Sequence, residues 1–110
     1  MKPAEHVLLS ERFDVPLLRT VQQGTENVVM ICDKELLGKK FKEGELTIEV
    51  KESFYGGHDA SVEKCIAALQ SATIANLLGS IIKKAVSAGI IDQNNVIKIQ
   101  KVLHAQLIRL

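Results

Sequence analysis

Five apolar residues in an uninterrupted run, Val28 to Cys32, constrain the fold more than any other segment of the chain. The run is rich in β-branched residues, and five residues are too few for a buried helix. A strand that is apolar on both sides is typical of a sheet covered on both faces. The run therefore predicts a central strand of a sheet.

The residues that follow predict a short helix and then a loop. Asp33 can cap a helix over residues 34–37, because its side-chain oxygen can accept from free backbone N–H groups. Gly38 can adopt the left-handed conformation that ends such a helix. Residues 39–42 are predicted as a loop and residues 43–44 as a turn.

Apolar and polar residues then alternate over residues 46–50, which predicts a strand with one face in solvent. Residues 53–58 are predicted as a loop. Gly56 and Gly57 stand side by side in it and would allow positive φ angles there. The loop precedes a helical pattern, so it is expected to join a strand to a helix.

Two helices are predicted in the middle of the chain. Over residues 62–69 the apolar positions follow the spacing i, i+3, i+4, i+7, which marks one face of a helix. Asp59 or Ser61 would cap its start. A second pattern of paired apolar residues over 77–86 predicts another helix, and Gly89 is expected to end it.

The remaining segments complete the predicted order β–α–β–α–α–β–β. Residues 72–76 are either a brief extended segment or the first turn of the second helix. Residues 96–99 predict one strand, and residues 102–110 another that contains the sequence His104-Ala105-Gln106. The predicted fold class is α+β, with a short mixed sheet and two main helices packed on one face.

Length and proline content indicate the domain organisation. The chain has 110 residues, which is the size of a single domain. Both prolines, Pro3 and Pro16, lie near the start, where the apolar pieces fit neither helical nor strand spacing. Residues 1–26 are predicted as an N-terminal extension, either ordered or a flexible arm, and residues 27–110 as one α+β domain.

The sequence lacks the signatures of several functional classes. Two cysteines, Cys32 and Cys65, make no disulfide framework and no zinc-binding spacing. Tyr55-Gly56-Gly57-His58 lacks the Lys-Ser/Thr pair of a phosphate-binding P-loop. No apolar run approaches the ~20 residues that span a bilayer. We therefore expect a cytoplasmic protein without a cofactor, metal ion or membrane segment.

Four sequence blocks together resemble a small archaeal family of unknown function that is described as predicted RNA-binding. They are Cys32-Asp33-Lys34-Glu35-Leu36-Leu37-Gly38-Lys39, Phe54-Tyr55-Gly56-Gly57, Ala75-Asn76-Leu77-Leu78-Gly79 and His104-Ala105-Gln106. The similarity extends over about residues 27–106. It implies a small α+β fold and a link to RNA or to translation.

Charge is distributed unevenly and supplies candidate contacts for RNA. Residues 1–72 carry a net charge of −3 and residues 73–110 a net charge of +4, although a basic face of this size can also be only solvated. The candidate phosphate contacts are Lys39, Lys40, Lys42, Lys83 and Lys84. The candidate base or sugar contacts are Tyr55, His58 and His104.

Two other functions compete with this RNA-binding or ribosome-associated module. The chain could be a protein-interaction subunit or a homo-oligomer that pairs through residues 107–110 or the apolar pieces of residues 1–20. It could also be a small enzyme that uses Cys32 or His58, with the histidine as a base. Burial of Cys32 in the core is the competing interpretation for that residue, so a non-enzymatic role is predicted.

Overall fold

A computed structural model of the protein describes residues 15–110. Its main sheet has six strands in the order β5-β1-β2-β6-β8-β7. The strands are β1 (Leu17–Gln23), β2 (Glu26–Cys32), β5 (His58–Asp59), β6 (Ile74–Leu78), β7 (Ile97–Ile99) and β8 (Val102–Ile108). A separate hairpin consists of β3 (Lys40–Glu43) and β4 (Leu46–Glu49). The helices are α2 (Glu52–Tyr55), α3 (Val62–Ser71), α4 (Ile81–Ser87) and the 3₁₀ helices η1 (Lys34–Leu36) and η2 (Gln93–Asn95).

The run from Val28 to Cys32 forms the greater part of β2, in the interior of the sheet, which confirms the prediction of a central strand. Val29, Ile31 and Cys32 have no exposed surface. Strand β2 pairs with β1 on one side in an antiparallel register and with β6 on the other in a parallel register. All other pairs in the sheet are antiparallel, so β2 and β6 are the parallel pair of a mixed sheet.

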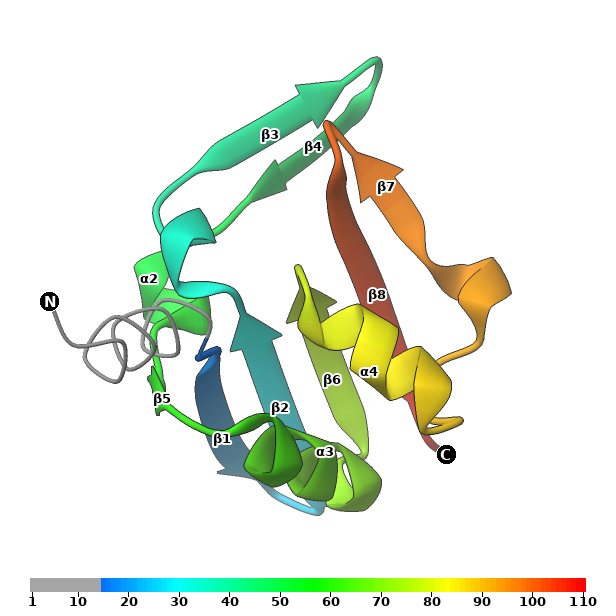
Figure 1. Cartoon of the computed structure of the whole chain (residues 1–110). Helices are drawn as coiled ribbons and strands as arrows, with labels where there is room; N and C mark the ends of the chain where they lie inside the picture. Colours follow the sequence, from blue (N-terminus) through cyan, green and yellow to red (C-terminus); the bar gives the residue numbers. More distant parts are fainter. Residues whose placement is uncertain (1–14) are drawn as a thin grey trace, which may run out of the picture.

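The helices α3 and α4 lie on the same face of the sheet (Figure 1), where they bury a core around Leu69, Ile82 and Leu77. The apolar spacing over residues 62–69 therefore predicts α3 correctly. Of the two capping candidates, Ser61 caps this helix, since its Oγ accepts from the backbone N–H of Lys64 at 3.1 Å. The predicted α+β class, with two main helices on one face, is confirmed.

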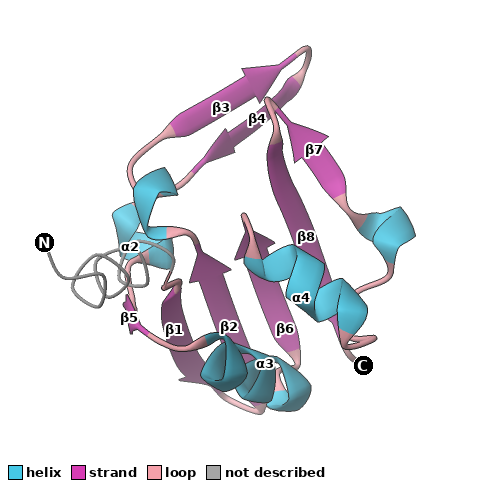
Figure 2. Cartoon of the chain, viewed as in Figure 1, coloured by secondary structure: helices cyan, strands magenta, loops and turns pink. Residues whose placement is uncertain are grey.

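Among residues 15–110, the segments that cover the opposite face of the sheet lie over one end of it. There a second core cluster gathers Met30, Cys32, Leu36 and Tyr55, with Val50 at the end of the hairpin. The cover consists of η1, α2 and the β3–β4 hairpin, which projects at the top of Figure 2. Cys32 is thus a buried member of this second layer.

A strand that the sequence analysis did not predict, β1, lies within the segment predicted as an N-terminal extension. It pairs with β2 along its whole length, from Leu17 opposite Cys32 to Gln23 opposite Glu26. Leu17 and Leu18 are each only 6% exposed, so this part of the segment belongs to the core. Residues 1–14 lie outside the described residues.

The second predicted helix begins later than its apolar pattern indicates. Leu77 and Leu78 belong to β6, and α4 starts at Ile81. Leu77 and Leu78 are buried on opposite faces of the sheet, in the two core clusters. The two adjacent buried leucines therefore resemble the start of the apolar pattern of the following helix. The ambiguous segment 72–76 is therefore largely extended, and Gly89, with φ of +75°, follows the end of α4 as predicted.

Two segments predicted as loops contain regular structure. Residues 39–42 contribute to β3, which pairs with β4 in a hairpin whose turn has Gly44 at φ +61°. Residues 53–58 contribute to α2 and to the start of β5. Gly56 has a φ of −71°, and Gly57 does not have a positive φ either, so neither glycine uses the positive φ angle that its lack of a side chain allows.

The C-terminal part forms a hairpin, as the sequence predicts. Strand β7 covers most of the predicted strand 96–99, and β8 is one continuous strand through His104. The turn between them places Gln100 at φ +49° and Lys101 at φ +71°. Two consecutive residues with positive φ are typical of a two-residue hairpin turn, here without glycine.

Candidate functional site

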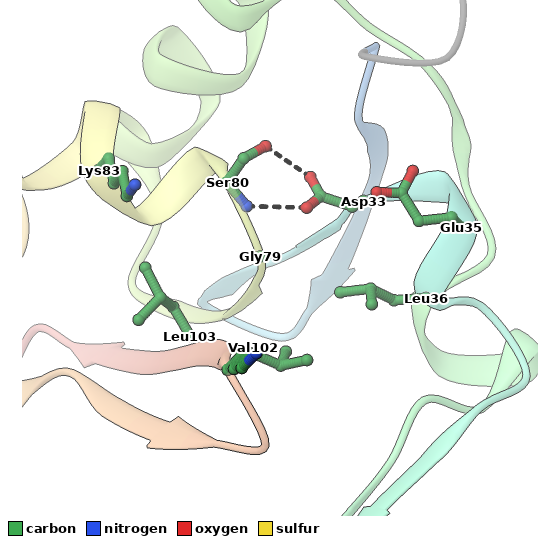
Figure 3. A pocket seen from close by; sticks show the side chains of 9 residues that line it. Asp33, Glu35, Leu36, Gly79, Ser80, Lys83, Val102 and Leu103 are labelled. Carbon is green, nitrogen blue, oxygen red and sulfur yellow. Dashed lines mark hydrogen bonds between the residues drawn. The ribbon is translucent and has the colours of Figure 1, made fainter.

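A pocket of about 300 Å³ opens at the end of the sheet where the parallel strands β2 and β6 finish (Figure 3). Because β8 runs antiparallel to β6, it begins at this same end. Apolar side chains on one side of the pocket come from η1 and from the start of β8: Leu36, Val102 and Leu103. Ligand pockets of proteins combine such apolar surfaces with a few polar groups.

One wall of the pocket is formed by hydrogen bonds between Asp33, which follows β2, and Ser80, which lies shortly after β6. The carboxylate of Asp33 accepts from the Ser80 backbone N–H at 2.9 Å and from the Ser80 hydroxyl at 2.7 Å (Figure 3). Asp33 therefore does not cap η1 as predicted, since its side chain makes no hydrogen bond there. Gly79 lies against this carboxylate at φ +99°, and a Cβ built on it would be 2.3 Å from Asp33 Oδ2.

The β3–β4 hairpin connects two other walls of the pocket. At its base, Gly38 N–H donates to the Val50 carbonyl and Val50 N–H donates to the Lys39 carbonyl, both at 2.8 Å, directly after η1. At its tip, Glu43 Oε1 accepts from the Gln100 backbone N–H at 3.0 Å. The hairpin thus connects η1 to the β7–β8 turn. Hydrogen bonds fix its base next to η1 and its tip to that turn.

Charged side chains of both signs line the pocket. Glu35 lies on the η1 side and Lys83 on the α4 side of the opening (Figure 3), and Lys101 comes from the β7–β8 turn. In residues 15–110 the ion pair within 4.0 Å is Lys34–Asp59, at 2.8 Å, on another part of the surface. The carboxylate of Glu35 and the two ammonium groups are therefore available to a ligand.

The structure brings some of the predicted RNA contacts together and separates others. Lys83 lines the pocket, and Lys84 follows it on α4, also exposed. The three exposed lysines of the hairpin region extend along the segment that joins the pocket walls: Lys39, Lys40 and Lys42. Lys40 pairs across the hairpin with Glu49, which reduces the local positive charge.

The three predicted base contacts do not line this pocket. Tyr55 is only 5% exposed and packs in the second core cluster, whereas Phe54 beside it is 41% exposed. His58 is exposed on β5, opposite Leu18. His104 is half-buried in β8, and this burial lowers its pKa below the ordinary value for a histidine.

Cys32, the candidate nucleophile, is a core residue. Burial raises the pKa of the thiol to about 11, and the charges of Asp33 and Glu35 contribute in the same direction. A thiol with this pKa is protonated at neutral pH, and the thiolate is the form that attacks. The buried location agrees with the competing interpretation of Cys32 as a packing residue.

We expect the free energy of unfolding to fall as the pH rises above 9. The pKa of Cys32 and that of Cys65 are about 11 in the folded protein, against an ordinary value of 9.0. The unfolded chain therefore loses these protons first, which favours unfolding between pH 9 and 11. Tyr55, with a pKa of about 12, adds to the effect above pH 10. Urea titrations below pH 9 and near pH 11 measure it, and equal stabilities would contradict the burial of these groups.

Sequence reasoning missed Glu35, Ser80 and Lys101 as site residues. Lys101 belongs to the basic C-terminal third, and Glu35 to the first block of the family resemblance, but neither signal indicates a shared pocket. The described residues contain no group of three or more His, Cys, Asp or Glu side chains that could hold a metal ion. Within the same residues, no helix is long and apolar enough to cross a membrane.

The fold and the pocket define a class of small α+β domains with a mixed sheet, two helices on one face and a pocket at the end of the parallel pair. A family described as Protein of unknown function (DUF424) matches residues 21–110, so the chain belongs to this family. The resemblance to a family of unknown function is thereby confirmed. Among curated proteins, the comparison finds no match.

A solved structure has the same fold. It is the crystal structure of an uncharacterized conserved protein from Methanopyrus kandleri, with a TM-score of 0.68 and 26% sequence identity. The match covers 86% of this chain and 94% of that chain. These comparisons establish the family and the fold, and neither states an activity.

Proposed function

We propose that the protein is a cytoplasmic, non-enzymatic RNA-binding module that contacts RNA or the ribosome. The observation that supports it most directly is the pocket to which α4 contributes Lys83 and the β7–β8 turn contributes Lys101. Two ammonium groups from different elements of the fold, next to apolar side chains, suit a nucleotide with its phosphate.

The distribution of the other lysines supports the same proposal. Lys84 continues the basic surface of α4, and Lys39, Lys40 and Lys42 extend it along the hairpin. Lysine ammonium groups in solvent contact phosphates and release counterions, so affinity depends on salt. The acidic residues Glu43 and Glu49 on the hairpin limit the positive potential, which favours a short RNA contact over a long one.

The double variant Lys83→Gln/Lys101→Gln is expected to weaken RNA binding and its salt dependence. Each lost phosphate contact lowers the slope of log affinity against log salt by about 0.7 on single-stranded RNA. A fluorescence titration with bulk cellular RNA at several salt concentrations measures both quantities. The triple variant Lys39→Ala/Lys40→Ala/Lys42→Ala tests the hairpin in the same way.

The matched control is Lys51→Gln/Lys64→Gln, which removes the same charge from exposed positions that do not line the pocket. It is expected to bind RNA like the wild type, apart from a small nonspecific loss. Equal weakening in both double variants would contradict a localised site. Absence of RNA binding by the wild type even at low salt would overturn the proposal.

A second candidate function, a protein-interaction subunit or a homo-oligomer, is favoured by the outer edge of β1. Strand β5 pairs with β1 only at Leu17 and Leu18, so the backbone of residues 19–23 has no strand partner on that side among the described residues. Such an edge can accept a strand of another chain. A mass that rises with protein concentration, together with no affinity for RNA, would favour this function.

A further inference from the structure

We propose that the pocket at the end of β2 and β6 holds a guanine base of single-stranded RNA, recognised by Glu35, with its phosphates on Lys83 and Lys101. This inference rests on the proposed RNA-binding function and adds the identity of the base. Its starting point is the geometry of one pocket, whose volume of about 300 Å³ is at the lower end of the range for small-molecule sites.

The two acidic residues of the pocket have different roles. Both carboxylate oxygens of Asp33 are engaged by Ser80, at 2.9 and 2.7 Å, so this side chain builds the wall. Glu35 makes no side-chain hydrogen bond or ion pair with any other residue in 15–110, and it lines the same pocket. An ionised carboxylate only accepts hydrogen bonds, so a ligand group that contacts Glu35 in this pocket must be a donor.

The two acceptor oxygens of the Glu35 carboxylate distinguish between the four bases. Guanine presents two adjacent donors on its Watson–Crick edge, N1–H and the N2 amino group, which match the two oxygens of one carboxylate. Adenine and cytosine place an acceptor beside their amino group, and uracil has one N–H between two carbonyls. An acceptor that faces a carboxylate is repelled, which adds discrimination against these three bases.

The other walls suit the rest of a guanine nucleotide. Leu36, Val102 and Leu103 provide apolar surface for the flat faces of the base. Lys83 is on the far side of the opening from Glu35 (Figure 3), so a base held at Glu35 would direct its sugar and phosphate toward the Lys83 ammonium group. Base edges in single-stranded RNA are free for such contacts because they are not paired.

The test is a fluorescence titration with a labelled oligouridylate that carries one central guanine, adenine, cytosine or inosine. The guanine oligomer is expected to bind roughly tenfold more tightly than the adenine or cytosine oligomers. Inosine lacks the N2 amino group and is expected to lose most of this preference. Guanosine monophosphate should compete with the guanine oligomer, and adenosine monophosphate should not.

The variant Glu35→Gln is expected to abolish the preference for guanine while salt-dependent binding through Lys83 and Lys101 is retained. Glu45→Gln removes the same charge from the exposed hairpin turn, outside the pocket, and is expected to change neither. Glutamine has nearly the size of glutamate, and position 35 is exposed on η1, so the fold should be retained.

The possible outcomes separate this inference from the proposed function. Equal, salt-dependent binding of all four oligomers would overturn guanine recognition and leave RNA binding in place. No binding of any oligomer or of guanosine monophosphate would overturn both. Binding of guanosine monophosphate without binding of any oligomer would overturn the assignment to RNA and indicate a free nucleotide instead.

Discussion

Replacing Gly57 with alanine is expected to lower the free energy of unfolding by about 3 kcal/mol or more, at the upper end of what overpacking costs. A Cβ at this position would lie 2.1 Å from the carbonyl oxygen of Leu18 and 2.8 Å from the backbone N of Arg19. Optimal separations between nonbonded atoms are ~3.5–4.0 Å. Both neighbours are backbone atoms of β1, so no side chain can rotate to relieve the contact.

The matched control for Gly57 is Gly24→Ala, in the turn between β1 and β2. Gly24 has a φ of +59° and nothing within 4 Å of its built Cβ. The control therefore costs about 1 kcal/mol from the left-handed backbone alone. Urea denaturation of both variants measures the difference, and a Gly57→Ala variant no less stable than Gly24→Ala would contradict the close contact with β1.

At Gly57 the sequence predicted part of the structural requirement correctly and part of it incorrectly. The pair of glycines at 56 and 57 indicated an unusual local requirement, which is correct. The requirement is close approach to another strand, not a positive φ, and β1 could not be identified from its own pattern. Polar residues occupy the middle of that strand and Pro16 precedes it, so its two buried leucines did not stand out.

Local patterns predicted the elements that bury one face or lie in the interior of the sheet. The run Val28 to Cys32 and the helical face over residues 62–69 are examples, and both are confirmed. The pattern over 77–86 predicted α4 but placed its start too early, because Leu77 and Leu78 of β6 are both buried and the apolar start of α4 follows after two residues. Gly79, inside the predicted helix, was the signal for a boundary.

Local sequence patterns could not predict the pocket, because the topology of the sheet brings its walls together. Its walls come from residues 33–36, 79–83 and 101–103, and only the pairing of β2 with β6 and of β6 with β8 brings them together. A parallel pair has no short turn that reveals it in the sequence. The sequence therefore indicated Lys83 as a candidate but could not place it beside Lys101 or Glu35.

Replacing Gly79 with alanine is expected to lower the free energy of unfolding by about 3 kcal/mol, from backbone strain and overpacking together. Its φ of +99° disfavours any side chain, and the added Cβ would lie 2.3 Å from Oδ2 and 2.6 Å from Cγ of Asp33. The variant must either distort the start of α4 or displace the Asp33 carboxylate from Ser80. Urea denaturation measures the loss, with Gly89→Ala as control, since Gly89 has φ +75° and open space around its Cβ.

A double-mutant cycle with Asp33→Ala separates the contact from the strain. Asp33→Ala alone is expected to cost about 1–2 kcal/mol, because it removes two hydrogen bonds of an ionised acceptor to Ser80. In that background Gly79→Ala meets no carboxylate, so only the strain of about 1 kcal/mol should remain. The two changes together should therefore cost about 2 kcal/mol less than their sum. Simple additivity would mean that Gly79 is required by its φ alone, and that the wall of the pocket does not depend on its contact with Asp33.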